Sequence, residues 1–211
     1  AEDELGLSDD HGGIMVLDPQ KYEIGKNFAD YFDILVDDVF EIGLTPNRTD
    51  AMSHYGVARD LHAFLSTNQQ KSTFEKVAAE SLNKTEAHNF SLEIENGDLV
   101  PRYIGAVITD VKVQDSPEWL KNRLKAIGLS PINNVVDITN YILHGYGQPL
   151  HAFDADKIAD KKVKVGLVKE GTKFTTLDGV ERTLNGSEII IKDGQDKPMC
   201  IAGVFGGAES G

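Results

Sequence analysis

The chain is poor in several residue types and patterns, and each shortage excludes a class of protein. It contains one cysteine, Cys200, in 211 residues, which excludes an internal disulfide framework and predicts a reducing, cytoplasmic setting. It has no run of about 18 consecutive apolar residues, the length that a membrane-spanning helix needs. The first residues are acidic and polar, unlike a signal peptide. The sequence therefore predicts neither a membrane protein nor a disulfide-rich secreted one.

Basic side chains are also scarce. Lys and Arg number 21 against 34 Asp and Glu, and the net charge is −13. Residues 1–50 hold most of the excess, with 13 acidic and 3 basic side chains. Nonspecific nucleic-acid binding depends on cationic contacts to phosphates, so this chain is poorly suited to it. We expect this chain to contact only the end of any RNA partner, or other parts of an assembly to hold most of that RNA.

Motifs of several common chemistries are missing. None of the six histidines forms a pair with metal-ligand spacing, and there is no second cysteine, so we expect no metal site. Gly206-Gly207 lacks the spacing and the following Lys of a phosphate-binding loop. A nucleophilic serine in a GxSxG turn is absent as well.

The apolar patterning predicts an α+β fold with mixed or antiparallel sheets, a few packed helices, and two parts joined by a polar linker. Helical spacing and start signals predict helices at 51–65, 116–127 and about 133–146, with Ser116 as N-cap and Pro117 in the first turn of the second. Strand patterns occur at 13–17, 33–42, 102–113, 162–168, 188–192 and 198–204, and Asp178-Gly179 is typical of a hairpin turn.

Residues 67–89 are rich in Ser, Thr, Asn, Gln and Lys, which is typical of a linker. We therefore expect one part at residues 1–66 and a second at residues 90–211. The second part ends in a glycine-rich segment typical of a loop, Phe205–Gly211, so we expect it to be truncated at its C-terminus.

The most informative stretch is residues 131–154. Thr139 and Asn140 lie within the apolar stripe formed by Val135, Val136 and Leu143, although an amphipathic helix normally keeps polar groups on its opposite face. A buried amide or hydroxyl costs about 1–3 kcal/mol unless it is hydrogen-bonded. The protein's own backbone, water or a ligand must satisfy these groups, and the residues alone leave that choice open.

His151 follows the rigid Gln148-Pro149 turn directly after this helix. Judged by the residues alone, a hydrogen-bonded core histidine is the favoured interpretation of His151, ahead of a functional one. His54, His62 and His144 have a structural role by default, and Cys200 is expected to be a small core residue because its neighbours are apolar.

At this point the sequence resembles the bacterial phenylalanine–tRNA ligase beta subunit. The resemblance rests on residues 133–141 (NNVVDITNY) with 148–154 (QPLHAFD), and on three further motifs that agree in order and spacing: 40–50 (FEIGLTPNRTD), 116–120 (SPEWL) and 201–207 (IAGVFGG). Residues 5–11 (LGLSDDH) also match. It implies that residues 1–66 are the C-terminal half of the family's N-terminal domain and that residues 90–211 are part of its editing domain.

The family's enzyme charges tRNA(Phe) with phenylalanine, using ATP, in a heterotetramer with an alpha subunit. The resemblance implies that ATP and Mg are bound elsewhere, with no cofactor in this fragment. It implies that this region binds the tRNA acceptor end and hydrolyses mischarged tyrosyl-tRNA(Phe).

The resemblance places His151, Asn140 and Thr139 in the catalytic pocket. It adds Asn134, Pro149, Ala202 and Gly203 as substrate-binding positions. The family's glutamate that recognises the tyrosine hydroxyl lies beyond the glycine loop, and Glu209 stands too early for it, so we expect the isolated fragment to be weak or inactive. The alternative is a noncatalytic structural or RNA-docking module, whose polar helix residues form a core network.

Overall fold

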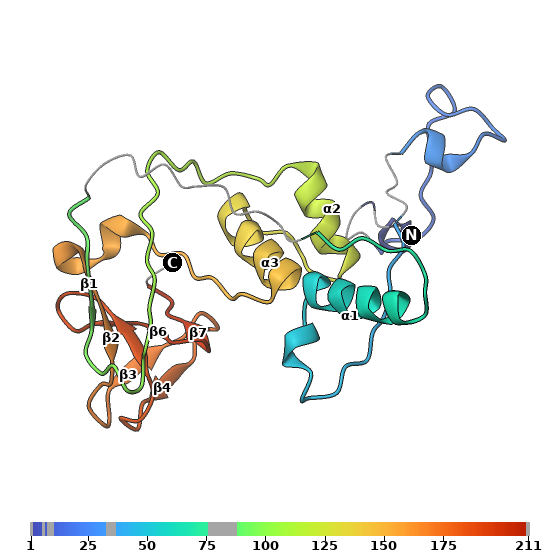
Figure 1. Ribbon diagram of the computed structural model, residues 1–211. Helices are drawn as coiled ribbons and strands as arrows, with labels where there is room; N and C mark the ends of the chain where they lie inside the picture. The colour runs from blue at the N-terminus through green and yellow to red at the C-terminus, as the bar shows by residue number, and fades with distance from the viewer. Residues whose placement is uncertain (1, 6, 8–10, 33–36, 76–87, 210–211) are drawn as a thin grey trace. The chain divides into compact units, whose positions relative to one another are not determined.

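The computed structural model describes residues 2–5, 7, 11–32, 37–75 and 88–209 (Figure 1). They separate into two compact units, Ala1–Phe40 and Glu41–Gly211. The boundaries predicted at residues 66 and 90 stay predictions, and residues 76–87 of the predicted linker lie outside the described part.

The first unit is built from two 3-10 helices, η1 at Asp3–Leu5 and η2 at Phe28–Asp30, with an aromatic cluster. The Phe32 ring stacks on Phe28 with centroids 4.2 Å apart and on Tyr22 at 5.6 Å. The strand predicted at 13–17 is wrong, because no strand forms there. Of the strand predicted at 33–42, residues 33–36 lie outside the described part and 37–42 form no strand.

The described residues of the second unit form three α-helices: α1 at His54–Thr67, α2 at Glu118–Ala126 and α3 at Asn134–Tyr146. α3 packs against both α1 and α2. Leu120 and Leu124, one turn apart on α2, are fully buried and anchor that helix. The three predicted helices are confirmed, although α1 begins three residues later than its pattern suggests, behind a short 3-10 turn, η3, at Thr49–Ala51.

The start of α2 differs from the prediction. The N-cap position is Pro117, which has no side-chain cap, whereas the Ser116 hydroxyl donates to the carboxylate of Asp137. The Ser116 hydroxyl is thus turned toward the carboxylate on the next helix, and no side-chain cap forms at the start of α2.

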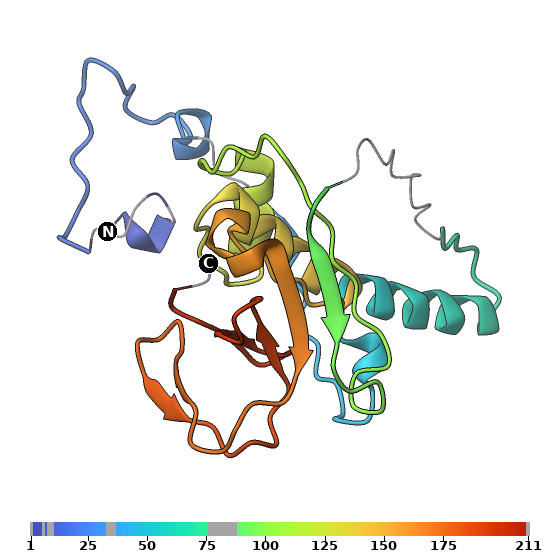
Figure 2. The same cartoon turned by 90° about the vertical axis from the view of Figure 1, so that its left-hand side faces the viewer.

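The main sheet has five strands in the order β1-β2-β5-β6-β7. β1 and β2 are parallel and lie side by side in Figures 1 and 2, whereas the remaining neighbours are antiparallel. Short 3-10 turns, η4 at Ala155–Lys157 and η5 at Ala159–Lys161, lead into β2. The strand bounds are Ser91–Ile94 (β1), Lys162–Gly166 (β2), Ile190–Lys192 (β5), Pro198–Ile201 (β6) and Phe205–Gly206 (β7).

A second, two-stranded sheet pairs β3 at Lys173–Thr175 with β4 at Glu181–Thr183. Asp178 and Gly179 form the connecting turn, and Gly179 has φ +76°, so the predicted hairpin is confirmed. The main core lies on the five-stranded sheet and contains Val100, Val165, Ile191, Met199 and Cys200.

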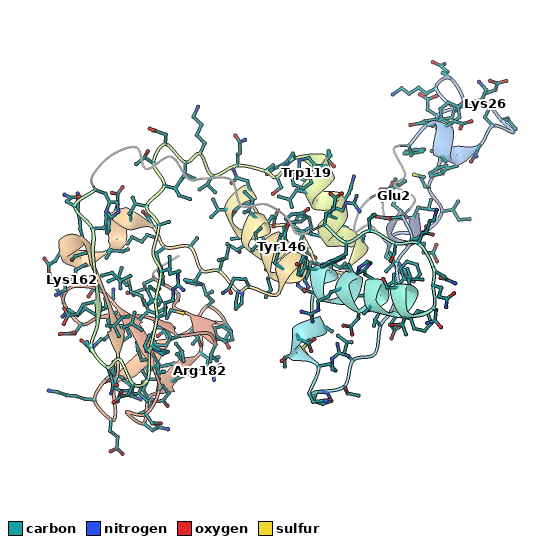
Figure 3. The ribbon with its side chains drawn as sticks, viewed as in Figure 1. Glu2, Lys26, Trp119, Tyr146, Lys162 and Arg182 are labelled. Atoms are coloured by element: carbon teal, nitrogen blue, oxygen red, sulfur yellow. The ribbon has the colours of Figure 1, made fainter. Side chains whose placement is uncertain are left out.

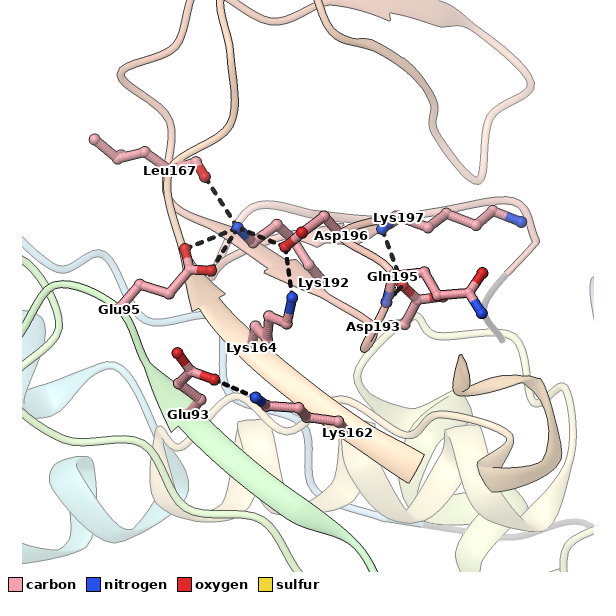
Figure 4. A network of polar contacts seen from close by, with 10 residues as sticks. All are labelled: Glu93, Glu95, Lys162, Lys164, Leu167, Lys192, Asp193, Gln195, Asp196 and Lys197. Carbon is pink, nitrogen blue, oxygen red and sulfur yellow. Dashed lines mark hydrogen bonds and ion pairs between the residues drawn. The ribbon is translucent and has the colours of Figure 1, made fainter. Parts of the chain in front are cut away.

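A buried charge network crosses this sheet (Figure 4). Lys192 on β5 is 5 % exposed, and its Nζ donates to both carboxylate oxygens of Glu95, at 2.9 and 2.7 Å, and to the Leu167 carbonyl at 3.2 Å. Gly166 of β2 lies below Glu95, and a Cβ there would sit 2.9 Å from the Glu95 Cβ. The missing side chain of Gly166 thus makes room for the carboxylate over the sheet.

The strand predicted at 102–113 is wrong, and β1 was not predicted. Residues 102–113 form no strand, and Asp110 has φ +59°, which breaks a β conformation. The far end of this segment is held by Asn134 of α3 instead of by a neighbouring strand. Alternation of apolar side chains sets which face each residue points to, but a strand also needs a partner for its backbone.

The α+β class and the mixed sheet are confirmed. Among the described residues, no helix has the length and apolar character required to cross a membrane.

Candidate functional site

The candidate site is built around α3, and its first turn is fixed by two asparagines. The Oδ1 of Asn133 accepts the backbone N–H groups of Val135 and Val136, both at 3.0 Å, which makes it the N-cap. Asn134 uses both ends of its amide: its Nδ2 donates to the Lys112 carbonyl at 2.9 Å, and its Oδ1 accepts the Gln114 N–H at 3.2 Å. Asn134 therefore ties residues 112–114 to the helix, and its predicted role in substrate binding stays a prediction.

Asp137 is the polar centre of this region, and the sequence did not single it out as a functional position. Its side chain is fully buried, Oδ2 accepts the Ser116 hydroxyl at 2.6 Å, and Oδ1 accepts the Ile132 N–H at 2.9 Å. A buried carboxylate is tolerated when its oxygens are hydrogen-bonded in this way. Its position between the two asparagines and the Thr-Asn pair was the only signal in the sequence.

Thr139 and Asn140 lie one turn further along α3, and both are half-buried. The Thr139 hydroxyl donates to the Val136 carbonyl at 2.7 Å, so its own helix uses the proton and leaves the oxygen lone pairs as acceptors. The side chain of Asn140 has no hydrogen-bond partner among the described residues. Its amide thus keeps both a donor and an acceptor for a ligand or for water.

The end of α3 aims the chain toward His151. Gly147 ends the helix with φ +77°, and its N–H donates to the Leu143 carbonyl at 2.8 Å, as a left-handed C-terminal cap does. The exposed Gln148 and Pro149 follow, and the Gln148 Nε2 donates to the Pro149 carbonyl at 3.2 Å. Pro149 therefore acts here as part of a rigid turn, while its predicted contact with substrate stays a prediction.

The His151 ring packs against Phe153 and against Gly206 of the last strand, β7. It meets the Phe153 ring edge to face with centroids 4.5 Å apart, and a Cβ on Gly206 of β7 would come within 2.8 Å of its Cε1. The residue as a whole remains exposed, but this packing removes water from the imidazole and lowers the pKa of His151 below its ordinary value. The ring is therefore neutral near pH 7 and has one nitrogen that accepts a hydrogen bond.

Ala202 and Gly203 form the turn between β6 and β7, the hairpin on which His151 packs. The Ala202 N–H donates to the Ile189 carbonyl at 2.9 Å, so this residue is tied to the sheet. Gly203 has φ +70° and no atom within 4 Å of a Cβ position, so its backbone is open on that side. Gly206, which the sequence did not select, connects this hairpin to the histidine.

Two hollows stand out in the described residues, and the seven predicted site residues line neither. One of about 250 Å³ lies between α2 and the start of α3, lined by Asp115, Ser116, Lys121, Lys125, Pro131, Ile132 and Asp137. The other, of about 180 Å³, lies beside β6 and carries Lys157, Lys173 and Lys197 on its wall. The structure places His151 against Gly206, three residues after Gly203 in the same hairpin. That Thr139 and Asn140 share a cleft with them stays a prediction.

No group of three or more metal-ligating side chains gathers within the described ranges.

The chain is similar to known proteins over its full length. A family model described as the B3/4 domain matches residues 99–211. Phenylalanine–tRNA ligase beta subunits are 50 % identical in Bacteroides thetaiotaomicron and 47 % in Porphyromonas gingivalis, each over 100 % of this chain and 26 % of the relative. The beta subunit of Fusobacterium nucleatum is 42 % identical over 98 % of this chain and 25 % of its own length. The chain thus spans about a quarter of the length of these curated relatives.

Proposed function

The chain belongs to the B3/4 domain family, and from this premise we propose that it is the part of a phenylalanine–tRNA ligase beta subunit that hydrolyses mischarged tyrosyl-tRNA(Phe). The similarity to beta subunits over the whole chain supports this assignment and bears out the resemblance seen in the sequence. In this proposal the complete enzyme works in the cytoplasm and contains an alpha subunit. It charges tRNA(Phe) with phenylalanine, with ATP and Mg bound outside this chain.

The observation that carries the proposal is the setting of His151. Its imidazole is neutral near pH 7 and rests on Gly206 of β7, in the hairpin whose turn contains Ala202 and Gly203. The bond to be broken is an activated ester, which needs an oriented water more than a strong nucleophile. His151 accepts a hydrogen bond from that water, or from the terminal ribose, and holds it for attack on the ester carbonyl.

Thr139 and Asn140 then have different roles toward the aminoacyl group. Because the Thr139 proton is already donated to Val136, its oxygen acts as an acceptor for the substrate's ammonium group. The Asn140 amide offers both a donor and an acceptor, which suits the ester carbonyl or a ribose hydroxyl.

Tyrosine and phenylalanine differ by one hydroxyl, and a synthetic site shaped for phenylalanine does not strongly reject a slightly larger isostere. A second site that hydrogen-bonds the tyrosine hydroxyl rejects phenylalanine, because its polar groups would then be unpaired at about 1–3 kcal/mol each. The Gly203 backbone in the β6–β7 turn is open to such a ligand on the side where a Cβ would lie.

The test is deacylation of tyrosyl-tRNA(Phe) by the complete enzyme. We expect His151→Ala to lower the rate at least tenfold while phenylalanine charging is unchanged, and the matched variant His88→Ala, at an exposed histidine, to have no effect. His151→Gln separates two roles: retained activity indicates positioning of water, and loss equal to that of His151→Ala indicates a general base. An unchanged deacylation rate in His151→Ala would remove this residue from the mechanism.

A second candidate, a noncatalytic structural or RNA-docking module, is favoured by one observation. The polar side chains of Asn133, Asn134, Asp137 and Thr139 all hydrogen-bond within the protein. On this interpretation the polar motif of α3 is a structural network. Editing that survives substitution of both Asn140 and His151 would support it.

A further inference from the structure

The first turn of α1 lies against the last turn of α3, the helix that leads to His151 (Figure 1). The Nδ1 of His54 and the carbonyl oxygen of His144 are 3.0 Å apart. Because a carbonyl group only accepts, Nδ1 carries the proton of this hydrogen bond. The last carbonyl groups of a helix have no partner within it, and His54 supplies a partner from another helix.

Two further contacts join the same two helix ends. The Tyr55 ring on α1 lies beside the ring of Tyr146 on α3 (labelled in Figure 3), with centroids 6.2 Å apart. A Cβ on Gly147, the C-terminal cap of α3, would lie 3.6 Å from the Cβ of Ser53. Ser53 is itself the N-cap of α1, because its Oγ accepts the Gly56 N–H at 3.0 Å. The end of α3 is thus held against α1 by its backbone and by a side chain.

The segment before α1, residues 48–53, is held in place by charged side chains. The Arg48 Nε donates to the Asp50 Oδ1 at 3.0 Å, and Arg48 also pairs with Asp60 of α1. Arg59 of α1 pairs with the Asp50 carboxylate and donates to the Asp50 carbonyl at 3.1 Å. Two arginines and two aspartates thus fix this segment on the first two turns of α1, and such a network counts for more than an isolated surface pair.

We propose that the start of α1 positions His151 for ester hydrolysis, and that His54 is the positioning residue, acting through the last turn of α3. The proposal rests on the proposed function. Three residues separate Gly147 from His151, and one of them, Pro149, has a fixed φ, so a shift of Gly147 is transmitted to the imidazole. A misplacement of about 1 Å can lower a rate about 100-fold. The charged motif at residues 40–50 thereby gains a role at the site.

The test is deacylation of tyrosyl-tRNA(Phe) by the complete enzyme with variants of His54, each shown by circular dichroism to be folded. His54→Leu removes the donor, and we expect kcat to fall about tenfold with KM unchanged, because His54 acts through α3 and not on the substrate. His54→Asn should recover most of the loss, because the asparagine Nδ2, like the histidine Nδ1, is bonded to Cγ. His54→Gln carries its amide one bond further out and should stay as slow as His54→Leu. The matched control His88→Leu, at an exposed histidine, should deacylate like the parent enzyme, and every variant should charge phenylalanine normally.

A second measurement does not depend on activity. The NMR signal of the His151 Cε1 proton should shift in His54→Leu and return toward its original position in His54→Asn. Gly56→Ala tests the same coupling from the other side, because a Cβ on Gly56 would overlap the Asp50 carbonyl and displace residues 48–53 from α1. We expect the His151 signal to shift in this variant as well, and its deacylation rate to fall.

Three results would overturn the proposal: parent-like deacylation by folded His54→Leu, equal rates for His54→Asn and His54→Leu, or a His151 signal that none of the variants moves. Deacylation that is lost in His151→Ala but normal in His54→Leu would reject this inference and leave the proposed function intact. Normal deacylation in His151→Ala, with a His151 signal that still depends on His54, would reject the proposed function and retain only the coupling between α1 and His151.

Discussion

The Ser116 hydroxyl donates a 2.6 Å hydrogen bond to the Oδ2 of Asp137, 21 residues away, and no part of the Asp137 side chain is exposed. This bond joins the start of α2 to the first turn of α3. Because the Ile132 N–H occupies the other oxygen at 2.9 Å, one carboxylate connects three segments of the chain.

Loss of that carboxylate should destabilise the second unit. Asp137→Ala leaves the buried Ser116 hydroxyl and the Ile132 N–H without their acceptor, and we expect a loss of about 2–4 kcal/mol in the free energy of unfolding. Urea denaturation measures it. Ser116→Ala should lower the free energy of unfolding by about 1–3 kcal/mol. The control Asp115→Ala, which removes a neighbouring exposed carboxylate, should lower it by less than about 0.5 kcal/mol, as is usual for surface sites. Equal stability of Asp137→Ala and the parent chain would contradict the role given to this residue.

Removing one partner of the ion pair between Lys192 and Glu95 should also lower the free energy of unfolding. Lys192→Met leaves the Glu95 carboxylate without its cation, and we expect a loss of about 2–3 kcal/mol, at the low end for such pairs because Glu95 keeps 30 % of its side-chain exposure. The double variant Lys192→Met/Glu95→Leu should recover part of that loss. Lys162→Met, which breaks the more exposed pair with Glu93 (Figure 4), should cost less than about 1 kcal/mol. A double variant less stable than Lys192→Met would show that the pair contributes little.

His151 should make stability fall in mild acid. Burial lowers its pKa in the folded state below the ordinary 6.5, so the unfolded chain binds more protons in the window between the two values. Stability is therefore complete above about pH 6.5 and decreases as the pH falls through that window. The difference in urea midpoint between pH 7.5 and pH 5.5 should shrink in His151→Gln, because glutamine does not titrate.

The same titration can be followed directly by the NMR signal of the His151 Cε1 proton. In Gly206→Ala the new methyl group meets the imidazole, so the ring should move toward water and its pKa should rise to the ordinary value. An unchanged pKa in Gly206→Ala would mean that the contact with β7 does not cause the shift.

Cys200 should be unreactive in the folded protein. Its side chain lies in the core of β6, and burial raises the pKa of the thiol to about 11, so very little thiolate exists at neutral pH. In the native protein, a thiol reagent such as DTNB should react with Cys200 only as fast as the protein unfolds locally. In about 6 M guanidinium chloride, which exceeds the unfolding midpoint of ordinary domains, the reaction should be immediate. Rapid modification of the native chain at pH 7 would contradict this prediction.

The sequence was most informative where structure depends on neighbours along the chain. The bounds of α3 follow from Asn133 at its start and Gly147 at its end, and the hairpin of β3 and β4 follows from Asp178-Gly179. The alternation at residues 102–113 was misleading, because the left-handed Asp110 and a tether to Asn134 prevail over the strand pattern.

Composition, periodicity and motifs thus determined the α+β class, the helices and the family, because caps, turns and apolar stripes act over a few residues. Only the tertiary structure decided that Asp137 takes Ser116 away from α2, that Glu95 crosses Gly166 to reach Lys192, and that His151 rests on Gly206. Each of these contacts joins residues far apart in sequence. Their hydrogen bonds and close packing depend on which segments the fold brings together, and no local pattern records that.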